Sequence, residues 1–247
     1  MKPNYKIKPP KPGNLLYRSI FENNDDSTII KLISDGLNSV LINASKLIRD
    51  VELLVDHDRY SSARFLLTTA DEEIAKSYIF LDMCRLDFKK YESVLRSLCR
   101  AFYDHVFKHA YNKIHRFGRI HDLSHAREIW EVEITKWWPN NNIESGEPNM
   151  PHDTYFSREM PLYVDYIDYD QRWSVPRDER ESSYFKSTIG IDSLDKSKKV
   201  LEKLQWSHNC GFYDPNILSV FHTEFKKYYI KDDFDKDHLI KIYKKNR

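Results

Sequence analysis

The sequence predicts a mainly α-helical protein: an antiparallel bundle of long helices, followed by a small β-hairpin and a helical C-terminal extension. Three observations support this fold class. Apolar residues recur every three or four positions through most of the first half of the chain, and only one segment alternates as a strand does. The chain of 247 residues also contains only six glycines, which favours helices over tight hairpins. Short connections between long helices are typical of antiparallel bundles.

The first two long helices are predicted from their apolar stripes. We expect one to begin at Ser27, an N-cap candidate, and to end before the sequence Asp56-His57-Asp58. Its stripe steps by three and four residues without a break: Ile30, Ile33, Leu37, Val40, Ala44, Leu47, Val51 and Leu54. The second covers about 60–86, with the stripe Ala63, Leu67, Ala70, Ile74 and Leu81. The alanines of this stripe indicate close approach of a neighbouring helix.

Two more helices complete the predicted bundle. One covers about 89–117 and ends at Gly118, with an inward stripe of Leu95, Leu98, Phe102, Val106, Ala110 and Ile114. The next covers about 123–138 and ends at Pro139.

We therefore divide the chain into a disordered basic, proline-rich arm (1–13), a helical bundle (14–139) and an extension (140–247). The extension carries a hairpin at about 162–175, turning near Asp170, and helices at about 193–207, 215–229 and 235–245. We expect a group of aromatic residues to form a core between bundle and hairpin: Trp130, Trp137, Trp138, Tyr155, Phe156, Tyr163, Tyr166, Tyr169 and Trp173.

Composition excludes several classes of protein. No glycine-rich phosphate-binding motif occurs, so nothing indicates a P-loop or a dinucleotide fold. Three cysteines without paired spacing (Cys84, Cys99 and Cys210) predict a reducing, cytoplasmic setting. The basic N-terminus has no apolar core of the kind a secretory signal needs, and no apolar run is long enough to span a membrane.

The net charge of +1 hides a segregation of charge along the chain. Residues 88–119 carry eight Lys or Arg against two acids, whereas residues 144–181 carry ten acids against four arginines. This pattern allows a basic face for a polyanion, although solvated helix faces would give the same counts. The acidic hairpin region is predicted to be a docking surface for a regulatory protein.

Charged residues interrupt the helical patterns at two places. The second helix carries Glu72-Glu73-x-x-Lys76, and the third carries Arg100-x4-His105 followed by Lys108 and His109. Glu72 and Lys76 have the spacing of a surface ion pair, or they belong to a polar cluster packed against the third helix. Because no Glu-x-x-His partner occurs on another helix, we expect no metal and no cofactor.

A longer pattern resembles the AbiV family of bacterial abortive-infection proteins, within the HEPN superfamily of helical ribonucleases. Its first part is Ala44-x-x-Leu47…Asp50…Leu53-Leu54…Arg59-Tyr60-x-Ser62-Ala63…Glu72-Glu73-x-x-Lys76. Its later parts are His105-x-x-Lys108 and Arg158-Glu159-Met160-Pro161-Leu162-Tyr163-Val164-Asp165-Tyr166…Trp173…Pro176. The resemblance covers about residues 40–176.

In that superfamily an arginine followed after four to six residues by a histidine marks the active site, so the resemblance implies that Arg100 and His105 are catalytic. Two other pairs have this spacing, Arg116 with His121 and Arg119 with His125, but Arg100 lies in the third helix as the family pattern requires. The implied reaction is metal-independent RNA cleavage. Histidine would take the proton of a ribose 2′-hydroxyl, and arginine would hold the phosphate. DNA, which lacks this hydroxyl, should be inert.

The predicted supporting residues are Lys108, as a phosphate clamp, His109, as a second proton carrier, and the cluster of Glu72, Glu73 and Lys76, which would orient the arginine or histidine. Two features favour a rival interpretation, a non-catalytic protein- or RNA-binding scaffold or regulator. Positions five apart on one helix point about 140° apart. In addition, many active members carry a polar residue where this chain has Ala101.

The resemblance also implies partners. We expect RNA as the substrate, a homodimer with both motifs at the interface, and an activator or inhibitor protein encoded by a phage or in the same operon. The protein would then be a toxin of antiviral defence that arrests translation by cutting RNA. No membrane partner is expected.

Overall fold

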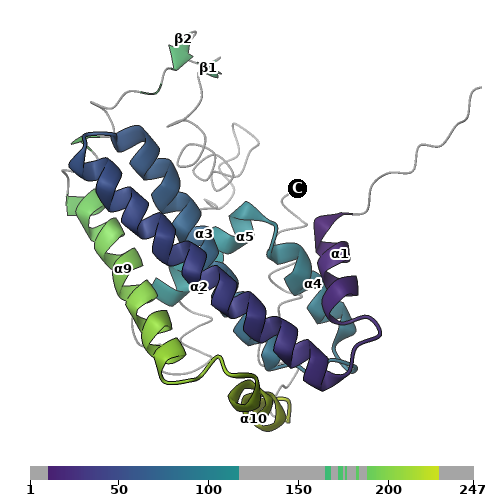
Figure 1. The fold of residues 1–247 in the computed structure, drawn as a ribbon. Helices are drawn as coiled ribbons and strands as arrows, with labels where there is room; N and C mark the ends of the chain where they lie inside the picture. Colours follow the sequence, from purple (N-terminus) through teal and green to yellow (C-terminus); the bar gives the residue numbers. More distant parts are fainter. Residues whose placement is uncertain are drawn as a thin grey trace, which may run out of the picture.

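A long antiparallel helix pair forms the centre of the protein. The computed structural model describes residues 11–116, 165–167, 172–174, 176, 182–183 and 188–227. Helices α2 (Asp26–Asp56) and α3 (Tyr60–Cys84) run side by side along most of the molecule (Figure 1). The other helices pack around this pair, and the described part of the chain is mostly helical. The predicted mainly α bundle is therefore confirmed.

The stripe predicted for α2 faces the core as expected, but the helix begins earlier than predicted. Ile33, Leu37 and Val51 are fully buried. Asp25, and not Ser27, is the N-cap: its carboxylate accepts a hydrogen bond of 2.7 Å from the amide of Thr28. Asp25 occupies the extended backbone conformation of a cap, with its side chain aimed at the unpaired amides of the first turn.

The close approach of α2 and α3 takes place at a glycine. A Cβ atom at Gly36 would lie 2.6 Å from the ring of Phe80 on α3, so only a residue without a side chain fits there. On α3, Ala63 and Ala70, the two alanines of the predicted stripe, are fully buried, and so is Ala75. The two helices thus approach each other where Gly36 of α2 faces the Phe80 ring of α3, and small residues of α3 line other parts of the same helix.

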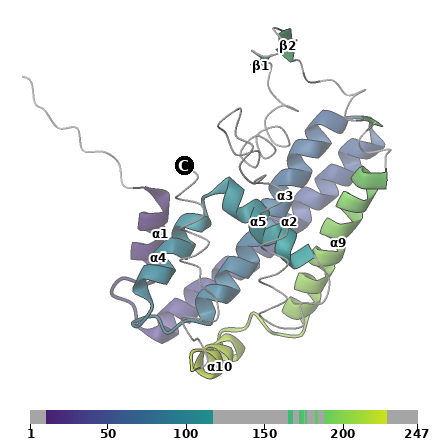
Figure 2. The ribbon, with the colours of Figure 1, turned by 180° about the vertical axis from the view of Figure 1, so that it is seen from behind.

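A short helix that the sequence pattern did not predict precedes this pair. Helix α1 (Pro12–Ile20) starts with proline at its first position and packs against α4 (Glu92–Ala101). The contact is close: a Cβ atom at Gly13 would lie 2.7 Å from Cα of Arg100. The start of α1 therefore lies directly against the end of α4 (Figure 2).

The single helix predicted for 89–117 is wrong, because it is broken into α4 and α5 (His105–Arg116). At the break, the amides of Tyr103 and Asp104 bond to carbonyls only three residues back, as in a tightened final turn. The carboxylate of Asp104 then accepts a 3.2 Å hydrogen bond from the amide of Phe107. Asp104 thus caps a new helix and stops the old one from continuing.

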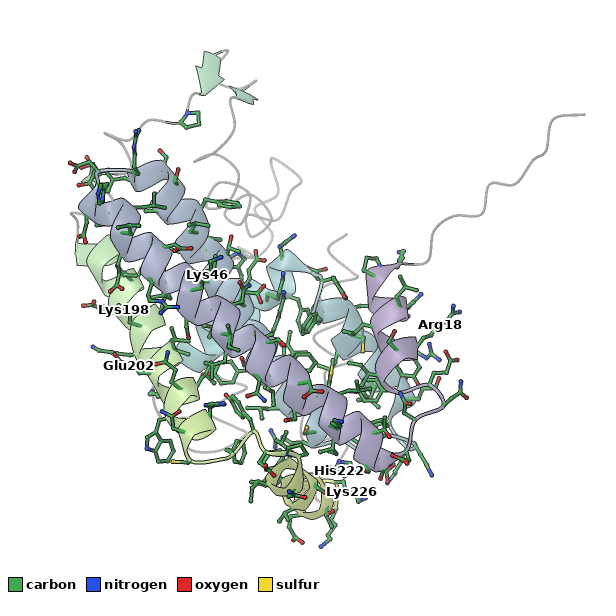
Figure 3. All side chains as sticks on the ribbon, in the orientation of Figure 1. Arg18, Lys46, Lys198, Glu202, His222 and Lys226 are labelled. Atoms are coloured by element: carbon green, nitrogen blue, oxygen red, sulfur yellow. The ribbon has the colours of Figure 1, made fainter. Side chains whose placement is uncertain are left out.

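The C-terminal helices pack onto the same central pair. Helix α9 (Thr188–Asn209) lies along α2 and also contacts α3 and α5, whereas α10 (Pro215–Phe225) crosses below α2 (Figure 1). Figure 3 shows Lys198 on α9 and His222 on α10. His222 is buried, donates from Nδ1 to the carbonyl of Cys84 at 2.9 Å, and stacks on the ring of Phe88 at 4.2 Å. These contacts fix α10 against the end of α3.

Two short strands, β1 (Asp165–Ile167) and β2 (Arg172–Ser174), pair in the antiparallel sense, with Tyr166 opposite Trp173. They fall within the range predicted for the hairpin. The helices predicted at 123–138 and 235–245, residues 1–10 of the arm predicted at 1–13 and most of the aromatic group lie outside the described residues. Helix α1 begins at Pro12, so the last two residues of that predicted arm are helical. In the part of the chain that is described, no helix is both long and apolar enough to cross a membrane.

Candidate functional site

One face of α5 gathers three polar side chains around a carboxylate of α3. His105, Lys108 and His109 are spaced by three and four residues, so they share a face of the helix. Nδ1 of His105 and Nζ of Lys108 both lie 2.7 Å from the same oxygen, Oε2 of Glu72. Nε2 of His109 lies 3.5 Å from the other oxygen, Oε1. Glu72 is therefore the centre of a cluster with His105, Lys108 and His109, each of which can donate a proton or carry a positive charge.

This cluster is largely removed from water. The side chains of Glu72 and Lys108 are only 4% and 5% exposed. Burial by itself would raise the pKa of the Glu72 carboxyl, but hydrogen bonds from His105 and Lys108, with His109 close by, outweigh burial and hold the pKa far below its usual range. Burial lowers the pKa of Lys108, and its bond to Glu72 opposes that shift. A charged carboxylate is thus held inside the protein by its neighbours.

His105 differs from its neighbours because its side chain is 41% exposed. A carboxylate only accepts hydrogen bonds, so the bond to Glu72 places a proton on Nδ1 of the histidine. The neutral ring then carries its lone pair on Nε2, the atom on the other side of the imidazole. A carboxylate that fixes both tautomer and ring orientation is the arrangement that prepares a histidine to act as a base.

Glu72 and Lys76, for which a surface pair and a polar cluster were both considered, have different partners. Lys76 instead bonds to Glu73, one turn away at 2.5 Å, and its ammonium also lies 5.0 Å from the centre of the Phe102 ring. Glu72 points from α3 toward α5, because neighbouring residues of a helix are turned by about 100°. Of the two interpretations considered, the polar cluster packed against the following helix is the one observed for Glu72.

Lys108, the residue predicted to clamp a phosphate, is buried. Its ammonium is buried against Glu72, so its position is that of a counter-charge to the carboxylate. His109 lies beside the same carboxylate and is mostly buried. Sequence spacing placed both residues next to His105, but it could not show which of them reached the surface.

Arg100 lies at the last turn of α4, on the other side of the helix break from His105. It is exposed, and it forms no ion pair with any residue in the described part of the chain. Ala101, which follows it, is buried in the core. The expected angle of about 140° between Arg100 and His105 does not apply, because the two residues belong to separate helices whose relative direction is set by the turn at 102–104.

Two residues that support the site were missed by the sequence interpretation. Asp104 caps α5 and so sets the position of His105; an acidic residue just before a helical stripe was the signal that could have revealed it. Asp71, next to Glu72, accepts a buried hydrogen bond of 2.7 Å from Ser197 of α9. No local pattern indicates that second contact, since the two residues are 126 positions apart.

Within the described residues, no three His, Cys, Asp or Glu side chains are grouped so as to hold a metal ion. In this helical bundle a buried glutamate of α3 faces His105, Lys108 and His109 of α5, and the chain matches a family of HEPN-domain proteins. Residues 32–193, more than half of the chain, match the AbiV family, and the chain belongs to this family of abortive-infection HEPN proteins. This confirms the resemblance found over residues 40–176. No curated protein and no solved structure matches the chain.

Proposed function

We propose that this protein is a metal-independent endoribonuclease in which His105 is the general base. The observation that carries the proposal is the 2.7 Å bond from Nδ1 of His105 to the buried carboxylate of Glu72. A buried carboxylate that orients a half-exposed histidine has a cost in desolvation, and catalysis is one reason for a protein to keep it. Membership of the AbiV family of HEPN proteins supports RNA as the substrate.

In the proposed reaction Nε2 of His105 accepts the proton of a ribose 2′-hydroxyl. The 2′-oxygen attacks the adjacent phosphorus, the bond from phosphorus to the 5′-oxygen breaks, and a proton returns to that oxygen. The products are a 2′,3′-cyclic phosphate and a 5′-hydroxyl. Glu72 stabilises the imidazolium that forms when His105 takes the proton. Lys108 keeps Glu72 ionised, and His109 is the candidate for the second proton carrier.

Arg100 is the candidate for binding the phosphate. A guanidinium can hold two phosphate oxygens at once and offset the negative charge of the transition state. Its exposure at the end of α4 leaves it accessible to a polyanion. The start of α1 against Arg100 also fixes the backbone from which this side chain extends.

The remaining parts of the proposal concern assembly and regulation. A homodimer would bring a second copy of Arg100 and His105 to the same interface. Activity in the cytoplasm, released during infection by a phage-encoded or operon-encoded protein, would arrest translation. If the acidic region binds that protein, a variant lacking 150–180 should lose regulation; unchanged regulation and partner binding would argue against this role.

A non-catalytic scaffold is the second candidate, and one observation favours it. Arg100 is exposed on a different helix from His105, and no described residue orients its guanidinium. In a scaffold, Arg100 would bind RNA or protein, and the cluster around Glu72 would serve only to join α3 and α5.

The test is cleavage of single-stranded RNA by the purified full-length protein in EDTA, with DNA of the same sequence as a control. Wild type is compared with His105→Ala, Arg100→Ala and the matched control Arg18→Ala, an exposed arginine on α1 (Figure 3). We expect cleavage by wild type and Arg18→Ala, a loss of 10²-fold or more in the other two variants, and intact DNA. RNA binding without cleavage would support the scaffold.

Expression in bacteria covers the case in which the enzyme needs an activator present only in cells. Growth arrest by wild type, together with growth of the His105→Ala and Arg100→Ala strains, would support the catalytic pair. Equal arrest by wild type and both variants would show that neither residue belongs to the active site.

A further inference from the structure

Between the two proposed catalytic residues lies an exposed aromatic ring. Tyr103 is in the turn that joins α4 to α5, three residues after Arg100 and two before His105. It is 47% exposed, although the residues on both sides of this turn pack into the bundle. Other large apolar side chains of the protein are exposed as well, so the ring is of interest for its place between Arg100 and His105 and not for its exposure alone.

The ring of Tyr103 is held in place from the side facing the protein. It meets Phe102 edge-on, with ring centres 5.6 Å apart, and Phe102 itself packs on Phe80 of α3 at 4.9 Å. The ammonium of Lys76 lies over the Phe102 ring at 5.0 Å. The amide of Tyr103 donates a 3.1 Å hydrogen bond to the carbonyl of Arg100, which fixes the backbone as well. Little motion therefore remains to be lost when a ligand packs against the exposed ring.

We propose that Tyr103 is a stacking site for an unpaired nucleobase of the RNA next to the cleaved phosphate. An exposed aromatic ring beside a free cation is the combination with which proteins bind single-stranded nucleic acid: the cation attracts the phosphate, and the ring stacks on the base. Here Arg100 is the cation, and the hydrogen bond between the two backbones holds both residues in the same turn. This inference rests on the proposed function, and it specifies the substrate as single-stranded.

The selectivity for single strands follows from where the stacking faces of a base lie. In a duplex both faces of each base are covered by neighbouring base pairs, so the Tyr103 ring could stack only after a base had left the helix. Because every base has a flat face, stacking alone gives little preference for sequence. The protein should therefore cut unpaired regions of RNA in preference to helical ones.

The experiment measures binding of a short fluorescent RNA, single-stranded or annealed to its complement, to the full-length protein. Cleavage is blocked by His105→Ala in every sample. The variants are Tyr103→Ala, Tyr103→Trp, and the control Trp206→Ala, which removes a 69% exposed aromatic ring from α9. We expect single-stranded binding to fall about 5- to 150-fold in Tyr103→Ala. It should stay close to the parent value in the other two variants, and the duplex should bind more weakly than the single strand.

The outcomes separate this inference from the proposed function. Equal affinity in Tyr103→Ala and the parent, with the same thermal unfolding, would overturn the stacking site while leaving cleavage by wild type untouched. Loss of binding in Tyr103→Ala, in a protein whose wild type cuts no RNA, would support the stacking site and overturn catalysis. In the cleaving enzyme, Tyr103→Ala should raise KM with kcat nearly unchanged. A fall in kcat alone would contradict a binding role.

Discussion

The substitution Glu72→Gln removes one charge from the centre of the buried cluster while keeping the size of the side chain. It leaves the ammonium of Lys108, 5% exposed, without the carboxylate that lies 2.7 Å away. Removing one partner of a buried ion pair costs about 3–5 kcal/mol, because the remaining charge stays desolvated. We expect the free energy of unfolding at pH 7 to fall by about that amount, measured by urea denaturation followed by circular dichroism.

The loss of unfolding free energy in Glu72→Gln should depend on pH, because the buried Lys108 can give up its proton. Its pKa is already lowered by burial, and without Glu72 it should fall further. Lys108 would bind its proton less tightly in the folded state than in the unfolded chain, and the folded state then gains stability as the pH rises. The variant should therefore recover part of its loss between neutral and alkaline pH, as Lys108 becomes neutral.

Two further variants test whether the charge of Glu72 balances that of Lys108. Glu73→Gln changes the neighbouring acid, whose pair with Lys76 is more exposed than that of Glu72 with Lys108, and should cost less than Glu72→Gln. Adding Lys108→Met to Glu72→Gln removes the isolated cation and should restore much of the stability. Equal losses in Glu72→Gln and Glu73→Gln, or no recovery in the double variant, would show that the charge of Glu72 does not balance Lys108 inside the fold.

Three other measurements test separate parts of the structure. Gly36→Ala places a methyl group against the Phe80 ring and should cost about 1–3 kcal/mol in urea denaturation; an unchanged midpoint would contradict the close contact. Asp104→Ala removes the cap of α5 and should cost about 0.5–2 kcal/mol and reduce cleavage, whereas Asp104→Asn should keep most of both. The pKa of Glu72 is lower in the folded protein than its ordinary value of 4.5, so the stability that Glu72 supplies is complete above pH 4.5 and is lost as the pH falls below it. Wild type should therefore lose stability in acid more steeply than Glu72→Gln.

The long helices were predictable because each buries a stripe that recurs in the sequence. In α2, Ile33, Leu37 and Val51 alone identify the core face, and no distant residue is needed to interpret them. Helix α1 was missed because it is short and starts with Pro12 and Gly13, two residues that are typical of loops. Its stability comes from packing on α4, which the local sequence does not reveal.

The site was predictable in its residues but not in its geometry. Spacing placed Lys108 and His109 beside His105, and the family pattern pointed to Glu72. The break between α4 and α5 was missed because Phe102 continues the apolar stripe of a single helix, whereas the hydrogen bond of one side chain, Asp104, decides where the new helix starts. The contacts of Glu72 with α5 could not be predicted either, because the break between α4 and α5 sets the direction from which α5 approaches α3.

The three consecutive acids of α3 limit where the chain can accept an inserted or deleted residue. Asp71 bonds to Ser197 of α9, Glu72 to α5, and Glu73 to Lys76 of the same helix. Successive residues turn by about 100°, so the contacts of Asp71 with α9 and of Glu72 with α5 require one rotational setting of α3 about its axis. One residue inserted earlier in α3 would turn Asp71 and Glu72 away from both partner helices at once, while the pair of Glu73 and Lys76 would move as a unit. Point substitutions at the surface of this helix should be common among its relatives, whereas insertions and deletions before Asp71 should be confined to the loops.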